Sequence, residues 1–128
     1  MTIESLVLMG EIGLAGALGA VTRYVLGRFV AERAGSTFPL GTLLINITGA
    51  FLIAFVFALT AKKLISPSLQ SILTTGFLGG YTTFSTMSWE GVQLARGGSN
   101  TQSVLYFGST FMLGITAGIL GLLLGLLL

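Results

Sequence analysis

The residues of this sequence that could do chemistry are mostly glycines, hydroxyl side chains and one amide. The sequence contains no Cys and no His, which excludes disulfides, thiol chemistry and the usual nitrogen or sulfur metal sites. Glycines and hydroxyl residues come together in the run GFLGGYTTFST, at residues 76–86. A glycine-rich break in a helix presents unwound carbonyls that suit hard cations, while the N-terminus of the following half-helix suits anions. Either kind of ion site could be built from this run.

Two ionisable residues and an amide accompany this run. Arg23 and Glu90 lie within apolar stretches, where ionisable residues are candidates for function because placing them in lipid is costly. Asn46 shares a helical face with Thr42 and Gly49. Its amide is a neutral donor suited to holding an anion briefly, but buried amides in membrane helices also simply bind a neighbouring helix. Both interpretations stay open from the residues alone.

Aromatic and hydroxyl side chains form two further stripes at helical spacing. Phe84, Met87 and Ser88 share one face, and the positive edge of a phenyl ring can meet an anion without a fixed positive charge. The second stripe lies in the last apolar stretch: Ser103, Tyr106, Thr110 and Gly114. Core packing of the ring and back-bonding of the hydroxyls to their own helix are the competing interpretations.

These residues must be positioned by membrane helices. Of the 128 residues, 53% are hydrophobic and only 8% are charged, against about 25% charged in ordinary soluble domains. Four stretches of about 20 residues, enough to span a bilayer, are nearly free of charge: residues 6–26, 40–59, 69–94 and 104–127. We therefore predict an all-α integral membrane protein with four transmembrane helices in a single domain, residues 1–128.

The third of these spans is predicted to be broken at mid-membrane. Ser66 is a suitable N-cap and Pro67 a suitable first helical residue. The two flanks, residues 67–78 and 84–95, are each about 18 Å long at the helical rise, so together they cross a bilayer once. An unpaired backbone group in hydrocarbon costs several kcal/mol. The break therefore predicts a ligand or a partner, with a glycine-eased kink as the alternative.

Basic residues are nearly balanced between the two ends of such a bundle. One end holds Lys62, Lys63 and the terminal amine, and the other holds Arg28, Arg33 and Arg96. Cytoplasmic loops normally hold the excess of Lys and Arg, so a balanced chain has no strong reason to choose one orientation. We expect it to insert both ways and to pair antiparallel with a second copy. The net charge of +2 belongs to these residues and does not indicate nucleic acid as a partner.

Small residues recur at short intervals in the first and last spans. They include Gly16 and Gly19 in the first, and glycines 114, 118, 121 and 125 in the last. Small residues at these intervals let helix backbones approach closely, so most of them are predicted to serve tight packing. Four helices are few to shield a polar pore from lipid, which again favours a second subunit.

With GTLLINITGAF (residues 41–51) and TTGFLGGYTTFSTMSWE (residues 74–90) considered together, the sequence closely resembles the Fluc, or CrcB, family of fluoride channels. GAVTRYVLG (residues 19–27), the four-span plan and the length extend the resemblance to nearly the whole chain. It implies an antiparallel, dual-topology homodimer with two fluoride pathways. Such a dimer exports fluoride passively across the cell (inner or plasma) membrane and is not an enzyme. It also implies a central structural sodium ion, bound by backbone carbonyls at the break.

The resemblance also assigns roles to single residues. Gly79 and Thr82 match the sodium-ligating carbonyls, contributed by both subunits. Asn46 matches the pore asparagine, and Phe84 matches the first of two pore phenylalanines. The other pathway positions are Arg23 in the vestibule, Ser85, Ser88 and Glu90 on a polar track, Tyr106 and Thr110 on the last helix, and Thr42, which we add because it shares the face of Asn46.

Two positions depart from the family pattern. Met87 stands where the second pore phenylalanine is expected, and Gly114 stands where the next hydroxyl is expected. Methionine is apolar and adaptable, and its weakly positive methyl hydrogens replace a ring edge in part. We expect the function to persist, with conductance or selectivity as the properties that Met87 affects.

Two other functions compete with a fluoride channel. A proton-coupled small multidrug-type antiporter would also be a short four-helix dimer, but it needs a carboxylate at mid-membrane in the first helix, and Glu11 lies too near the start. A non-transporting membrane assembly subunit would explain the glycines but not the polar stripes. The sequence also contains no P-loop that would couple transport to a nucleotide.

Overall fold

The computed structural model describes all residues, 1–128, and every element is helical. The elements, in chain order, are α1 (Ile3–Ala34), α2 (Leu40–Ala61), α3 (Pro67–Ser71), the π-helix η1 (Ile72–Leu78), α4 (Gly79–Tyr81), α5 (Phe84–Arg96) and α6 (Asn100–Leu127). Three of them, α1, α2 and α6, are long and apolar enough to cross a membrane. The prediction of an all-α membrane protein is confirmed, and the predicted third span is a composite of four short elements.

The composite segment begins as predicted. The Ser66 hydroxyl accepts a hydrogen bond from the amide of Leu69, at 3.1 Å, and Pro67 opens α3. This cap satisfies one of the amides that a helix start leaves unpaired. The helix then widens into the seven-residue π-helix η1 before it returns to α-helical geometry in α4.

The break itself lies at the two threonines that follow the glycines. Gly79 has helical dihedrals, φ −63° and ψ −38°, and the extended residues are Thr82 and Thr83. The break therefore lies within residues 79–83, the interval between the two predicted flanks, and α5 begins at Phe84 as expected. Threonine is β-branched and favours extended backbone. Thr83 also caps α5, because its hydroxyl accepts from the amide of Thr86 at 3.2 Å.

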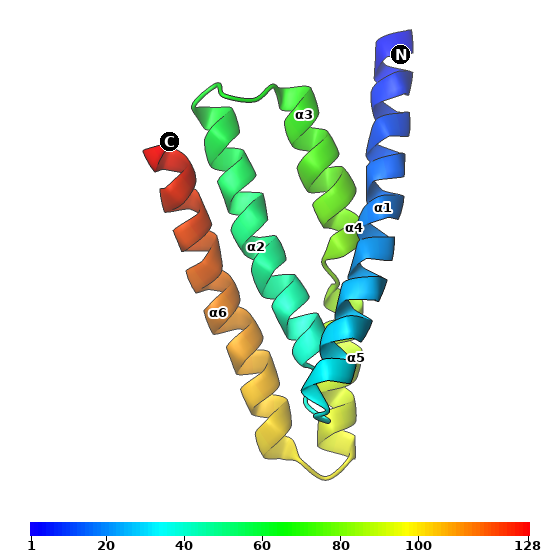
Figure 1. The fold of residues 1–128 in the computed structure, drawn as a ribbon, viewed down its shortest axis with the longest axis vertical. Helices are drawn as coiled ribbons and strands as arrows, with labels where there is room; N and C mark the ends of the chain where they lie inside the picture. The colour runs from blue at the N-terminus through cyan, green and yellow to red at the C-terminus, as the bar shows by residue number, and fades with distance from the viewer.

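The long axes of the helices run roughly in one direction, and the connections alternate between the two ends (Figure 1). Both termini and the α2–α3 connection lie at one end, and the α5–α6 connection lies at the other. Lys62 and Lys63 belong to the first end, and Arg96 closes α5 at the second. This arrangement agrees with the predicted division of basic residues between two ends.

Close backbone contact between helices occurs at some of the predicted glycines. A Cβ atom at Gly19 of α1 would overlap the carbonyl oxygen of Phe77, and one at Gly80 would overlap that of Gly16. A Cβ at Gly121 of α6 would likewise overlap the carbonyl oxygen of Phe51 in α2. Close packing is therefore confirmed for these glycines, whereas Cβ atoms at residues 10, 13 and 114 would have nothing within 4 Å.

Only 18 of the 128 residues are buried within the single chain. The buried apolar residues form two small clusters: Leu43, Met87 and Tyr106, and Ile45, Leu78 and Tyr81. Most large apolar side chains of α1 and α6 are exposed. So much exposed apolar surface requires a non-aqueous surrounding, which agrees with a multi-pass membrane protein.

Candidate functional site

The break in the composite segment is bridged by one side chain of α2. The Nδ2 group of Asn46 donates to the carbonyl of Thr83 at 3.0 Å, and its Oδ1 atom accepts from the amide of Thr83 at 2.9 Å. The amide side chain thus pairs with the extended backbone as a neighbouring strand would. Because unpaired backbone groups are costly in a membrane, this bridge stabilises the break. One N–H of the Asn46 amide remains for another acceptor.

Several backbone carbonyls at the end of the half-helix before the break lack hydrogen-bond partners. The amide and the hydroxyl of Thr82 both donate to the carbonyl of Leu78, at 2.9 Å each. The amide of Thr83 is taken by Asn46, so the carbonyl of Gly79 lacks its usual helical partner. The carbonyls of Tyr81 and Thr82 have no partner either. A helix C-terminus carries partial negative charge, and these oxygens together are ligands that suit a hard cation.

Arg23 supplies a positive charge at the same helix end. Its Nε atom donates to the carbonyl of Gly80 at 3.0 Å, across 57 residues of sequence. A cation near the C-terminus of a helix is stabilising, and the hydrogen bond ties α1 to α4. Arg23 thus stands beside the carbonyls of the break, a contact that sequence reasoning did not predict.

A first cavity, of about 280 Å³, opens on one side of the break. It contains four predicted pathway residues: Asn46, Phe84, Met87 and Thr110. Phe84 is 73% exposed, whereas Met87 is only 3% exposed. The Thr110 hydroxyl donates back to the carbonyl of Tyr106 at 2.8 Å, so in this structure it is engaged with its own helix.

A second cavity, of about 200 Å³, holds three other predicted residues. They are Arg23, Thr42 and Glu90, and the Thr42 hydroxyl donates to the Glu90 carboxylate at 2.6 Å. Thr83 lines both this cavity and the first one. The backbone bridged by Asn46 therefore separates two polar cavities, one with the aromatic ring and one with the charged groups.

The remaining three predicted residues line neither cavity. Tyr106 is fully buried, and its hydroxyl has no hydrogen-bond partner. Its ring packs edge-on against Phe38, with centroids 5.6 Å apart. Ser85 is exposed, with its hydroxyl 3.5 Å from that of Thr83, and Ser88 is partly buried. An unpaired buried hydroxyl is uncommon in folded proteins, so Tyr106 retains a donor for a ligand or water.

Sequence reasoning did not predict four lining residues of the first cavity: Ala50, Ile53, Thr83 and Phe111. Phe111 follows Thr110 on α6 and was not noticed, although helical spacing places it one turn before Gly114. Thr83 acts through its backbone amide and carbonyl, which no pattern of side chains could have indicated.

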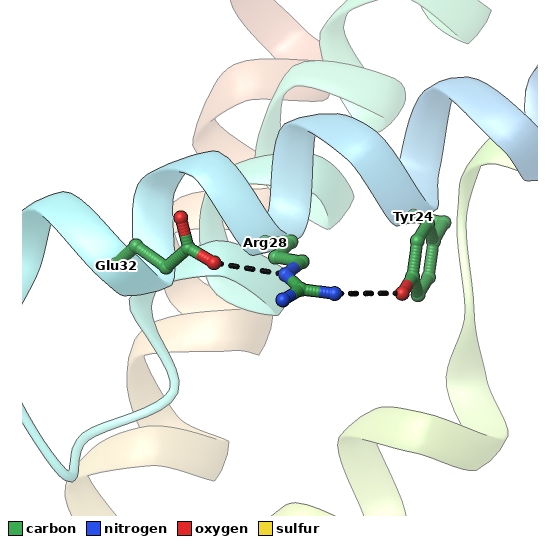
Figure 2. A network of polar contacts seen from close by, with 3 residues as sticks. All are labelled: Tyr24, Arg28 and Glu32. Carbon is green, nitrogen blue, oxygen red and sulfur yellow. Dashed lines mark hydrogen bonds and ion pairs between the residues drawn. The ribbon is translucent and has the colours of Figure 1, made fainter.

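A further polar network lies on α1 and includes Tyr24, which also lines the second cavity. Arg28 donates through Nε to Glu32 at 2.8 Å and through a terminal nitrogen to the Tyr24 hydroxyl at 3.0 Å (Figure 2). Glu32 neutralises Arg28 locally. Surface ion pairs stabilise little, but this pair lowers the net positive charge at its end of the bundle.

Together these features define a multi-pass helical membrane protein with polar cavities on both sides of a bridged helix break. Comparison with known proteins makes the assignment more specific. Residues 11–122 match the family described as CrcB-like protein, Camphor Resistance (CrcB). The chain belongs to this family, as its sequence motifs predicted.

Curated relatives extend over nearly the same region. The fluoride-specific ion channel FluC of Acidobacterium capsulatum is 46% identical over 115 residues, 89% of this chain and 92% of the relative. That of Aquifex aeolicus is 44% identical over 115 residues, 89% and 93% of the two chains. That of Rhizobium meliloti is 41% identical over 112 residues, 87% and 90%. The matched regions include both cavities and the break.

Proposed function

We propose that this protein is a fluoride-specific ion channel, a transporter without enzymatic activity, in the cell membrane. The observation that carries the proposal is the identity of 41–46% to fluoride-specific channels over most of both chains. The fluoride-channel prediction from the sequence is confirmed at this level. The cavities beside the break supply the chemistry that such a channel needs.

Fluoride accepts hydrogen bonds and donates none, so its hydration shell must be replaced by donors. The first cavity offers the second N–H of the Asn46 amide, and the nearby Tyr106 hydroxyl is buried and unpaired. Thr42 and Thr110 now donate to protein acceptors, but hydroxyl groups rotate to suit a new acceptor. Ser85 and Ser88 add hydroxyls on α5.

The two cavities give the anion a sequence of different environments. Arg23 in the second cavity attracts an anion, while Glu90 in the same cavity repels it and limits the time it stays. Phe84 in the first cavity offers a weak, uncharged contact through its ring edge. Weak contacts favour release, which conduction requires. A membrane potential negative inside supplies about 2.3 kcal/mol per charge per 100 mV, enough to drive passive export from the cytoplasm.

The assembly that we propose is an antiparallel homodimer of chains with four spans each, containing two fluoride pathways. It is supported by the open first cavity, by the exposed Phe84 ring and by the near balance of basic residues. Because the chain has no native cysteine, Thr101→Cys at the exposed start of α6 is a clean reporter. Impermeant thiol reagents should label it from both sides of the cell membrane. Labelling from one side only would contradict dual topology.

We also propose a structural sodium ion at the break, held by the carbonyls of Gly79 and Thr82 from both subunits. The donor set fits, since both carbonyls lack hydrogen-bond partners and lie at a helix C-terminus. The ion would neutralise these oxygens and join the two subunits. Replacing sodium by a large organic cation should lower the melting temperature of the dimer, and an unchanged melting temperature would argue against the ion.

The competing functions gain no support from the structure. Glu11 lies in a groove with Glu4 and Ser68, which belong to the first turns of α1 and α3, and this position does not suit a proton-coupled antiporter. An assembly subunit has no use for the cavities.

The decisive experiment measures fluoride and chloride efflux from liposomes that contain the purified protein. Fluoride should leave far faster than chloride once a potassium ionophore removes the electrical limit. Chloride efflux in the same vesicles is the internal control, and empty liposomes give the leak. Failure to release fluoride above the leak would eliminate the channel function.

A further inference from the structure

Phe111 of α6 is a second aromatic side chain in the first cavity, besides Phe84. It is 53% exposed in the single chain and lines the cavity together with Phe84, Asn46 and Thr110. Nothing in its sequence pattern marked it as more than an apolar residue of a membrane span. In the structure it lies among residues that the channel needs.

Met87, the residue expected to replace a ring at this site, is poorly placed to contact an ion. Only 3% of its surface is exposed, and it packs in a buried cluster with Leu43 and Tyr106. Its side chain therefore serves mainly to fill the core. Of the large apolar side chains named at this cavity, the rings of Phe84 and Phe111 have the most exposed surface.

The surroundings of Phe111 leave its ring room to meet a ligand. Gly114 lies one helical turn further along α6, on the same side of the helix. It lines the same cavity, and a Cβ atom there would have nothing within 4 Å. The absence of a side chain at Gly114 thus leaves free space beside the ring. The edge of a phenyl ring carries partial positive charge, so a ring bordering this space offers an anion the same kind of contact as Phe84.

We propose that Phe111 supplies the second phenyl edge of the fluoride pathway, in place of the phenylalanine that position 87 lacks. Phe111 is then a specificity-determining residue. Met87 and Gly114, the two departures from the family pattern, accompany this role of its ring. The inference rests on the proposed channel function, since it assigns one contact of the same pathway.

The test compares ring removal with ring retention at this position. Phe111→Leu and Phe111→Met both remove the ring, and the methionine side chain keeps most of the volume of the phenylalanine side chain. Phe111→Tyr keeps the ring. Phe57→Leu is the matched control, because Phe57 is an exposed phenylalanine of α2, 46% exposed, that lines none of the cavities described above. Each purified variant is checked for its oligomeric state by size-exclusion chromatography and is then assayed for fluoride and chloride efflux.

Ring removal should lower fluoride efflux about tenfold, which corresponds to about 1.4 kcal/mol in the barrier, and should lower the ratio of fluoride to chloride efflux. Phe111→Tyr and Phe57→Leu should stay close to the unmodified protein. Adding Met87→Phe to Phe111→Leu should restore part of the efflux, because a ring again borders the cavity.

Three results would overturn this role of Phe111. They are unchanged fluoride efflux in Phe111→Met, equal losses in Phe111→Met and Phe111→Tyr, and an equal loss in Phe57→Leu. If Phe111→Leu fails to form the native oligomer, the comparison of Phe111→Met with Phe111→Tyr decides the question. Absence of fluoride efflux in the unmodified protein would instead contradict the channel function itself, so the two failures are distinguishable.

Discussion

Two adjacent regions of the composite segment contact neighbouring helices in different ways. One is the break at Thr82–Thr83, and the other is the backbone of η1 and α4 just before it. At the break, the Asn46 amide and the Arg23 guanidinium hydrogen-bond to backbone groups. In η1 and at Gly80 of α4, glycines bring the chain into direct contact with the α1 backbone, and the bond from Arg23 to the Gly80 carbonyl is the one side-chain hydrogen bond between them. The first region is held by a few directional bonds, and the second by dispersion over a close surface.

The difference explains how one segment could combine tight packing with the ion site that we propose. Glycine brings no side chain into the contact, so the two backbones can pack closely. The break must keep some polar groups unpaired, and it tolerates this because Asn46 satisfies the most costly ones. Substitutions in the two regions should therefore have different effects. Those at the glycine contacts should impair folding, and those at the break should impair conduction.

The largest effect is expected from a side chain in the glycine-packed region. Gly19→Val should prevent α1 from packing on η1, because its Cβ would overlap the Phe77 carbonyl oxygen. Backbone cannot yield as a flexible side chain does, so the cost should exceed about 3 kcal/mol. Thermal melting in detergent measures it. Gly13→Val is the matched control, since its Cβ would meet nothing within 4 Å, and equal destabilisation of the two would refute the packing argument.

The next largest effect is expected at the bridge. Asn46→Asp removes the donor to the Thr83 carbonyl and places an anionic group at the proposed pathway, so fluoride efflux should be abolished while the proposed dimer still forms. Liposome efflux and chromatography measure the two properties. Asn100→Asp, at the exposed start of α6, makes the same chemical change as a control. Normal efflux in Asn46→Asp would remove Asn46 from the pathway.

A smaller effect is expected at the charged contact of the break. Arg23→Gln loses the positive charge beside the Gly80 carbonyl. Contacts of this type contribute about 1–2 kcal/mol, which should appear as a lower melting temperature of the folded protein. Arg23→Lys should retain part of the stability because it keeps the charge. If both variants had the same melting temperature as the unmodified protein, the α1–α4 contact would contribute nothing to stability.

The smallest effect is expected at the exposed network of α1. Arg28→Ala breaks the ion pair with Glu32 and the hydrogen bond to Tyr24, but both groups are freely hydrated when unpaired. The melting temperature and fluoride efflux should not change measurably. A clear loss of stability would mean that this face is covered in the assembled protein.

Much of the fold could be predicted from the sequence because lipid restricts the possibilities to a few. Apolar runs of spanning length predicted α1, α2 and α6, and Ser66–Pro67 predicted the start of α3. The break was predicted between residues 78 and 84, but its exact position within this interval was not, because glycine permits a bend without requiring one. Its actual position depends on Asn46, which is distant in sequence and whose side chain hydrogen-bonds to the backbone of Thr83.

The candidate site was predictable in type but less so in arrangement. Asn46, Phe84 and Thr110 were expected together from the family resemblance, and they do share a cavity. Helical spacing predicts only which residues of one helix share a face. That Arg23 and Glu90 lie across the bridge in another cavity depends on how α1 and α5 pack. The orientation of the Tyr106 hydroxyl and the burial of Met87 depend on packing in the same way.

The π-helix η1 also sets the rotational phase of everything that follows it. A π-helical turn holds about one residue more than an α-helical turn, and each residue of an α-helix turns the chain by about 100°. Deleting one residue between Ile72 and Leu78 would let this stretch relax to an α-helix and would rotate the unpaired carbonyls of the break away from their present direction. The widened turn therefore rotates the end of the segment relative to its start. As a result, the start can pack tightly against α1 while the unpaired carbonyls of the break point in another direction.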